Sequence, residues 1–277
     1  MKDSRNIWIY MKKLSLNEIK KIELDLLKKF DVYCKENGIR YFLSNGTLLG
    51  AVKYEGFIPW DDDIDVLVPR EDYDRFISLF PDDDRYRLFA FERKGQYRFP
   101  FAKLCDMTTR KEEENVDNGV VLGLDIDIFP LDAWNTDPEK AKREVKCIQR
   151  EMFYLSLSKL RKPDSKNPVK RAAKGIVMAY CKTVGSARWI RSILKESIRA
   201  EQKDSAYVGC KSWCIYGERE IIPAEAFADA VEVTFEGAKF PAPVGYDTYL
   251  RSLYGDYEKD PPMDQQRSHH TYTAYRK

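Results

Sequence analysis

Four aspartates stand close together in the segment Trp60-Asp-Asp-Asp-Ile-Asp65. The run Ile64–Val68 is rich in branched apolar residues, which predicts a short strand. Alternate side chains of a strand share one face, so we expect Asp63 and Asp65 on the same side, about 7 Å apart. Carboxylates held this close repel each other unless a cation neutralises them, and a divalent ion is the natural partner. The segment therefore predicts a metal site.

A second segment, Gly123-Leu-Asp-Ile-Asp-Ile-Phe129, repeats this alternation. As a strand it places Asp125 and Asp127 on one face and its two isoleucines on the other. If the two predicted strands are neighbours, three or four carboxylates converge on one patch. Such a patch suits one or two Mg²⁺ ions, or Mn²⁺, that bind a phosphate and stabilise the charge developing during phosphoryl transfer.

Two other interpretations of the acidic segment need to be weighed. The aspartates can form a solvated face of the sheet without any ligand. Asp61, Asp63 and Asp65 also match the first ligand positions of a calcium-binding loop, but Val66 stands where that loop requires glycine. Asp72 then replaces the glutamate that closes such a loop. We therefore disfavour calcium binding.

One turn upstream, Asn45-Gly46-Thr47, lies between a predicted strand at residues 39–44 and a short helix. Backbone N–H groups at the start of a helix, beside a glycine that allows close approach, form a corner that binds phosphate. Alone, Asn-Gly is also a common turn. The order strand, glycine turn, helix and strand with Asp-x-Asp resembles the layout of the nucleotidyltransferase superfamily.

The elements around these motifs predict an α+β protein with a nucleotidyltransferase-type mixed sheet and flanking helices. Ser15 and Glu18 form a capping-box signature for a helix that ends at Asn37-Gly38. We expect residues 1–135 to form the catalytic core with the N-terminal helix. Residues 136–277 are predicted to be largely helical, with a hairpin and a C-terminal motif that completes the site, in one integrated unit. The predicted elements are strands at 86–91, 99–105 and 120–129, helices at 138–160, 169–183, 187–202 and 246–254, and a hairpin at 231–240.

Composition narrows the class of protein further. The chain has 277 residues, and 47 Lys+Arg against 45 Asp+Glu leave a net charge of +2, which argues against a general nucleic-acid binder. No apolar stretch approaches the roughly 20 residues of a membrane span, and the N-terminus lacks a secretory signal pattern. Six scattered cysteines are typical of reduced thiols. We therefore expect a cytoplasmic protein.

The segment Lys159–Arg199 departs from this neutral average. It carries twelve basic residues and two acidic ones, interleaved with apolar residues at helical spacing. One interpretation is an ordinary pair of core-packing helices with a solvated face. The other is a basic amphipathic surface that contacts the inner face of a membrane, and the segment has no motif typical of nucleic-acid binding.

The run Gly46-Thr-Leu-Leu-Gly-Ala-Val-Lys-Tyr-Glu-Gly-Phe-Ile-Pro-Trp-Asp-Asp-Asp-Ile-Asp65 resembles the signature of the LicD family, which includes the fukutin-related proteins. Two later blocks are similar to the same family. They are Asp125-Ile-Asp-Ile-Phe-Pro-Leu-Asp132, and Tyr249-Leu-Arg-Ser-Leu-Tyr-Gly-Asp-Tyr257 with Pro261-Pro262 and Ser268-His-His270. The blocks cover most of the chain from about residue 40 onward.

The resemblance implies a metal-dependent transferase and assigns roles to particular residues. Asp63 and Asp65 would be metal ligands, Asp127 the third carboxylate and general base, and Asp61 a further metal contact. Lys103 falls where the family tends to carry a basic residue that neutralises phosphate charge. Asp125 departs from the family pattern, so the resemblance leaves open which aspartate of its strand meets the metal. The implied substrate- and nucleotide-binding residues are Asn45, Gly46, Thr47, Lys53, Trp60, His269 and His270.

The function implied is transfer of phosphocholine, or a related phospho-alcohol, from a CDP-linked donor. The acceptor would be a hydroxyl of a cell-surface glycan, such as lipopolysaccharide or teichoic acid, or of its lipid-linked precursor. Two alternatives keep the same fold. One is a nucleotidyltransferase that releases pyrophosphate from a nucleoside triphosphate, and the other is a non-catalytic module associated with glycans or membranes.

Overall fold

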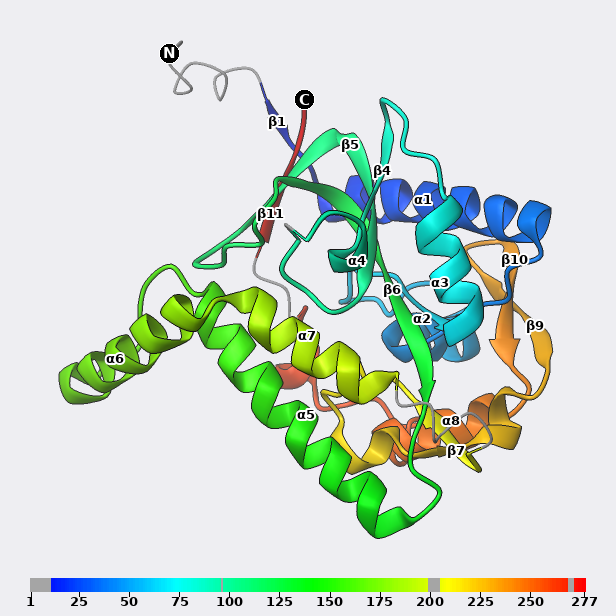
Figure 1. Ribbon diagram of the computed structural model, residues 1–277. Helices are drawn as coiled ribbons and strands as arrows, with labels where there is room; N and C mark the ends of the chain where they lie inside the picture. The colour runs from blue at the N-terminus through cyan, green and yellow to red at the C-terminus, as the bar shows by residue number, and fades with distance from the viewer. Residues whose placement is uncertain (1–10, 96, 199–204, 269–271) are drawn as a thin grey trace.

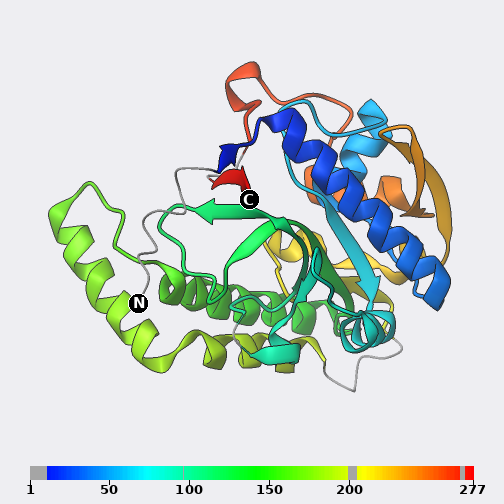
Figure 2. The same ribbon diagram turned by 90° about the horizontal axis from the view of Figure 1, so that it is seen from above.

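The computed structural model describes residues 11–95, 97–198, 205–268 and 272–277. Its centre is a mixed sheet in which the main path of strands runs β1-β11-β5-β6-β3-β2, with β4 beside β5 and β7 beside β6 (Figure 1). Figure 2 shows the sheet between α1 on one side and the helices α5 and α7 on the other. This arrangement confirms the predicted α+β class. The strands of this sheet are β1 Lys12–Lys13, β2 Phe42–Leu43, β3 Asp65–Pro69, β4 Tyr86–Phe89, β5 Ala102–Glu113, β6 Leu122–Ala133, β7 Tyr207–Gly209, β8 Ile222–Pro223 and β11 Tyr272–Arg276.

The helices agree closely with the expected segments. In α1 the Ser15 hydroxyl accepts a bond from the backbone N–H of Glu18, and Gly38 ends the helix with a φ of 60°. That left-handed conformation is one that glycine adopts at little cost, which explains its place there. The α-helices are α1 Leu16–Asn37, α2 Asn45–Tyr54, α3 Arg70–Leu79, α4 Phe91–Lys94, α5 Pro138–Lys159, α6 Pro168–Val184, α7 Ser186–Ser197 and α8 Tyr246–Tyr254.

The C-terminal part of the chain contributes more to the sheet than expected. The hairpin of β9 (Ala230–Phe235) and β10 (Ala238–Pro243) was predicted, whereas β11 was not. This last strand pairs antiparallel with β5, with Tyr272 opposite Glu113, and its residue Ala274 is buried. The pairing joins residues that are far apart in the sequence, so local pattern gives no sign of it.

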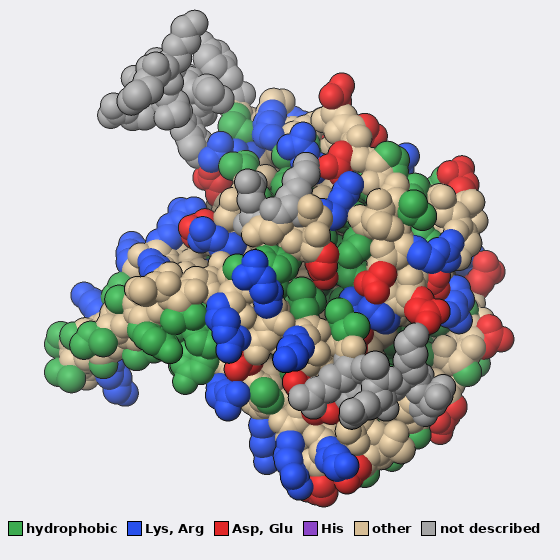
Figure 3. All heavy atoms as spheres, in the orientation of Figure 1, with side chains coloured by type: hydrophobic (Ala, Val, Ile, Leu, Met, Phe, Trp, Pro, Cys, Tyr) green, Lys and Arg blue, Asp and Glu red, His purple; other side chains and the backbone are tan. Residues whose placement is uncertain are grey.

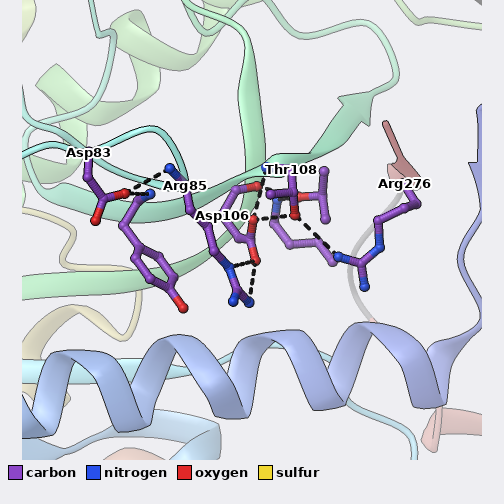
Figure 4. Close-up of polar contacts among 8 residues, drawn as sticks. Asp83, Arg85, Asp106, Thr108 and Arg276 are labelled. Atoms are coloured by element: carbon purple, nitrogen blue, oxygen red, sulfur yellow. Dashed lines mark hydrogen bonds and ion pairs between the residues drawn. The ribbon is translucent and has the colours of Figure 1, made fainter.

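A bulge in β5 sets the register beside β6. Asp106 pairs with Leu124, but Lys111 lies opposite Leu122, so the bulge shifts Lys111 along β6. The buried Asp106 carboxylate holds the bulge, because Arg85 donates to it at 3.0 Å and the Thr108 hydroxyl at 2.6 Å (Figure 4). These contacts fix the part of β5 that carries the site residues.

The helical half has a small core of its own. α5 packs against α7, and the buried cluster between them includes Trp134, Ile148, Trp189 and Ile193. α6 extends away from the rest of the molecule in both ribbon views (Figures 1 and 2). Among the described residues, the helices are all too short or too polar to cross a lipid bilayer.

Candidate active site

The carboxylates predicted from the two Asp-x-Asp motifs lie side by side. β3 and β6 are parallel neighbours, and Asp65 is the direct partner of Asp127 in their register. On the other side of β6, Asp127 is the partner of Lys103 on β5. Three adjacent strands therefore present Lys103, Asp127 and Asp65 in one row. The two Asp-x-Asp strands are neighbours, which is the condition on which the predicted carboxylate cluster depended. Asp63 stands just before β3, which begins at Asp65 rather than at Ile64.

Asp125 is paired with lysines, which explains how an extra acid is accommodated in this strand. The Lys103 ammonium lies 2.6 Å from Asp125 and also donates to Asp127. Lys111 lies 3.2 Å from the other oxygen of Asp125. Burial opposes the charged form of Asp125, but the two ammonium groups outweigh it and lower its pKa to about 2. Asp125 therefore forms ion pairs with two lysines, while Asp127 is the register partner of Asp65 on β3.

Asp65 is held by the turn that precedes α2. The Asn45 side-chain amide donates to the Asp65 carboxylate at 3.1 Å, and the Thr47 hydroxyl accepts the Asp65 backbone N–H at 2.8 Å. Burial raises the pKa of Asp65 well above its usual value, and the charges of Asp63 and Asp127 raise it further. Thr47, predicted to bind phosphate, is buried and thus directed at the protein backbone. Its role toward a ligand stays a prediction.

Tyr249 on α8 supports this turn, a contact that sequence patterns did not reveal. Its hydroxyl donates to the Asn45 side-chain oxygen at 3.0 Å and accepts the Asn45 backbone N–H at 3.3 Å. Asn45 has a φ of 46°, a left-handed conformation that asparagine tolerates. A Cβ on Gly46 would lie 3.0 Å from an Asp61 carboxylate oxygen, so glycine allows that close approach. The sequence signal for Tyr249 is its place in the third block that resembles the LicD family.

A cleft of 610 Å³ opens beside Asp63 and Asp65. Besides those two aspartates, five of the predicted binding and metal residues line it, together with aromatic side chains from both halves of the chain. On its rim Lys53 forms an ion pair with Asp260 at 2.6 Å, and the Tyr54 hydroxyl donates to the same carboxylate. The lining residues used below are Asn45, Gly46, Lys53, Tyr54, Trp60, Asp61, Tyr216, Tyr254 and Tyr257.

A second cleft, of 290 Å³, lies on the other side of the carboxylates. Lys103 and Asp127 line it together with Phe99 and Phe101, which precede β5, and with Trp213 and Tyr272. Asp63 lines both clefts. The acidic row therefore lies where two cavities meet, which is the arrangement that a reaction between two bound substrates requires.

The chemistry of these groups fits a hard divalent cation, since they offer carboxylate oxygens and Asp65 carries a raised pKa caused in part by like charges. As they stand, however, no three His, Cys, Asp or Glu side chains within the described ranges are arranged to hold a metal ion. Lys103 occupies one oxygen of Asp127. The metal site at Asp61, Asp63, Asp65 and Asp127 therefore stays a prediction.

The C-terminal motif reaches the acidic loop. Ser268 donates to the Asp62 carboxylate at 2.6 Å, and the Tyr272 hydroxyl lies 3.4 Å from the Asp62 carbonyl oxygen. His269 and His270, which were predicted to bind substrate, lie outside the described residues. The contacts on either side of them bring the end of the chain to the site.

Comparison with known proteins shows the family to which this chain belongs. Residues 38–149 match the LicD/FKTN/FKRP nucleotidyltransferase domain, and this range contains the turn, the acidic row and Lys103. A lipopolysaccharide cholinephosphotransferase LicD of Haemophilus influenzae is 31% identical over 270 residues, which cover 96% of this chain and 99% of that protein. An uncharacterised protein of Rickettsia typhi is 38% identical over 72 residues, 26% of this chain and 23% of its own length. The chain belongs to the LicD family.

Proposed function

We propose that this protein transfers phosphocholine, or a related phospho-alcohol, from a CDP-linked donor to a hydroxyl of a cell-surface glycan or its lipid-linked precursor. The likeness to a lipopolysaccharide cholinephosphotransferase over nearly the whole chain supports the reaction class. The observation that carries the proposal is the row of Asp65, Asp127 and Lys103 at the meeting point of two clefts.

The larger cleft suits the donor. Asn45 and Gly46, at the start of α2, line it, and a helix N-terminus favours a phosphate because its first N–H groups lack partners within the helix. Aromatic faces attract quaternary ammonium groups such as choline, and five aromatic side chains line the same cleft. These are Tyr54, Trp60, Tyr216, Tyr254 and Tyr257.

The smaller cleft then receives the acceptor. Its hydroxyl oxygen attacks the phosphorus of the choline phosphate, the new P–O bond forms, and the bond to CMP breaks so that CMP leaves with the bonding electrons. Asp127 takes the hydroxyl proton, and the ammonium of Lys103 offsets negative charge on the phosphate. Asp61, Asp63, Asp65 and Asp127 would hold Mg²⁺, or Mn²⁺, which when bound stabilises charge on the phosphate oxygens.

The direct test measures CMP release from CDP-choline with Mg²⁺ and a glycan acceptor. Asp65→Ala should lower the rate by a hundredfold or more, whereas Asp84→Ala, at an exposed acid outside both clefts, should leave it unchanged. A chelator should abolish release, and added Mg²⁺ should restore it. Full activity of Asp65→Ala would contradict the proposal, and pyrophosphate release from a nucleoside triphosphate would favour nucleotidyl transfer instead.

The donor itself can be identified by thermal shift. A donor that binds only the folded state raises the melting temperature by mass action. We expect CDP-choline to stabilise the protein more than CDP-ethanolamine, CDP-glycerol or CDP-ribitol, because only choline presents a quaternary ammonium to the aromatic side chains. An equal shift with all four would show that the cleft recognises the cytidine diphosphate alone.

We also place the reaction in the cytoplasm. The six cysteines are all free thiols, and unpaired thiols in such number are typical of a reducing compartment. Cell fractionation with an antibody against the protein tests this location.

A further inference from the structure

One helix of the protein exposes an apolar stripe to solvent. On α6, the exposed fractions of Val169, Ile176 and Tyr180 are 76%, 74% and 59%. Their spacing along the helix places them on one face, because seven and eleven residues correspond closely to two and three helical turns. Figure 3 shows hydrophobic side chains gathered over this projecting helix, with Lys and Arg side chains at their edges.

The stripe is not the face by which α6 is attached. Met178 and Cys181 are buried and pack in a small cluster with Leu157 at the end of α5. Met178 lies half a turn from the line of Val169 and Ile176, on the opposite side of the helix. The apolar stripe therefore points away from the body of the protein, where contiguous exposed apolar side chains mark a surface that binds a partner.

The charges around the stripe indicate the kind of partner. Residues 161–184 carry seven Lys or Arg and one acid, Asp164. That acid is already bound by Lys174, whereas Lys170, Arg171 and Lys182 are exposed. At about 100° per residue, Lys170 lies about a quarter turn from the stripe, and Arg171 and Lys182 lie on the opposite side of the helix. A helix with an apolar face and a basic face is the pattern of a helix that lies in the interface of an anionic bilayer.

We propose that α6 docks on anionic lipid, with Val169, Ile176 and Tyr180 inserted among the acyl chains and the neighbouring lysines at the headgroups. The segment that leads into α6 starts beside the smaller cleft. Val116, which lines that cleft, is paired with Leu160 at the end of α5, eight residues before α6 begins. If the proposed function is correct, docking brings the acceptor cleft near the membrane, but the docking itself does not depend on that function.

The apolar contribution is tested by sedimentation of the full chain with lipid vesicles. We expect binding to vesicles of equal phosphatidylglycerol and phosphatidylcholine, and little binding to phosphatidylcholine alone. Ile176→Gln with Tyr180→Gln should lower the partition coefficient more than tenfold, since both side chains leave water on insertion. The matched control, Val32→Gln with Leu79→Gln, changes exposed apolar residues of α1 and α3 and should bind like the wild type.

The electrostatic contribution is tested separately. Lys170→Gln with Lys182→Gln should lower the partition coefficient by about fivefold for each lysine at low salt, and the difference should shrink at high salt. Lys21→Gln with Lys28→Gln removes the same charge from exposed positions of α1 and should have little effect. Melting temperatures should stay unchanged in all four variants, because every substituted side chain is exposed.

Three results would overturn the proposal. The first is a wild-type protein that fails to bind the anionic vesicles, and the second is equal binding by the variant with Gln at 176 and 180. The third is a dimer in analytical ultracentrifugation that this variant dissociates, which would show that a second copy covers the stripe. None of these measurements uses catalytic activity, so their outcome does not depend on whether the proposed reaction is correct.

Discussion

Replacement of Tyr249 with phenylalanine removes one oxygen atom from the support of the site. That hydroxyl makes two hydrogen bonds to Asn45, at 3.0 Å and 3.3 Å, while the buried ring can remain in place. Each such bond stabilises a folded protein by about 1 kcal/mol. We therefore expect the free energy of unfolding to fall by about 2 kcal/mol, which corresponds to roughly 4 °C in melting temperature for a chain of this size.

The same variant should affect catalysis through position rather than contact. Without the Tyr249 hydroxyl, the side-chain oxygen of Asn45 loses its hydrogen-bond partner. The Asn45 side-chain nitrogen, which donates to Asp65 at 3.1 Å, is then less well fixed. We expect kcat for CMP release to fall about tenfold with KM little changed, since small displacements of a catalytic group cost large factors in rate.

Tyr73→Phe provides the matched control. The Tyr73 hydroxyl is buried, and within the described ranges it has no hydrogen-bond partner. Its removal should leave the free energy of unfolding unchanged or slightly higher, because no bond is lost and a buried polar group is removed. Urea denaturation measures both variants. Equal losses of stability in the two, or a fully stable and active Tyr249→Phe protein, would refute the reasoning.

Three further variants test the packing at the β5 bulge, the helix α6 and the pH dependence of stability. A Cβ on Gly123 would collide with the carbonyl oxygen of Asp106 at the β5 bulge, so Gly123→Ala should lower the free energy of unfolding in urea by about 3 kcal/mol. Gly175→Ala, on the exposed helix α6, should raise it by about 0.5–1 kcal/mol, and similar effects of the two would contradict the collision. Burial raises the pKa of Glu220 from 4.5 to about 8, so the folded protein keeps a proton that the unfolded chain loses. Its stabilisation is therefore complete at low pH and falls as the pH rises from 4.5 toward 8, by up to about 1.4 kcal/mol per pH unit. Glu220→Gln should flatten this dependence in urea denaturation, and an unchanged slope would show that other groups cause it.

Local sequence patterns were sufficient to predict those helices and strands whose ends or faces are marked by residues close together in the sequence. The Ser15 capping box and Gly38 mark the two ends of α1 because both act within one helical turn. The alternation of acidic and apolar residues in the two Asp-x-Asp segments marks β3 and β6 because successive side chains of a strand point to opposite faces of the sheet. The predicted carboxylate cluster required these two strands to be neighbours, and the parallel register of Asp65 with Asp127 meets that condition.

The remaining parts of the site depend on contacts between distant residues. Tyr249 reaches Asn45 across more than 200 positions, and β11 reaches β5 across about 160. No local periodicity records such pairings. Thr47 is a second example. A threonine hydroxyl can bind a phosphate or a backbone group equally well, and only the fold shows that the Thr47 hydroxyl accepts the backbone N–H of Asp65.

The charge pattern of β6 is explained only when the bulge is included. By alternation alone, Asp125 and Asp127 are equivalent, and either could face the carboxylate of Asp65. The shifted register brings Lys111 to Asp125, which also holds Lys103. Lys103 in turn contacts Asp127. Asp125 therefore affects the site through Lys103, which it shares with Asp127. Asp127 is itself the register partner of Asp65, so the two similar acids of this strand have different surroundings.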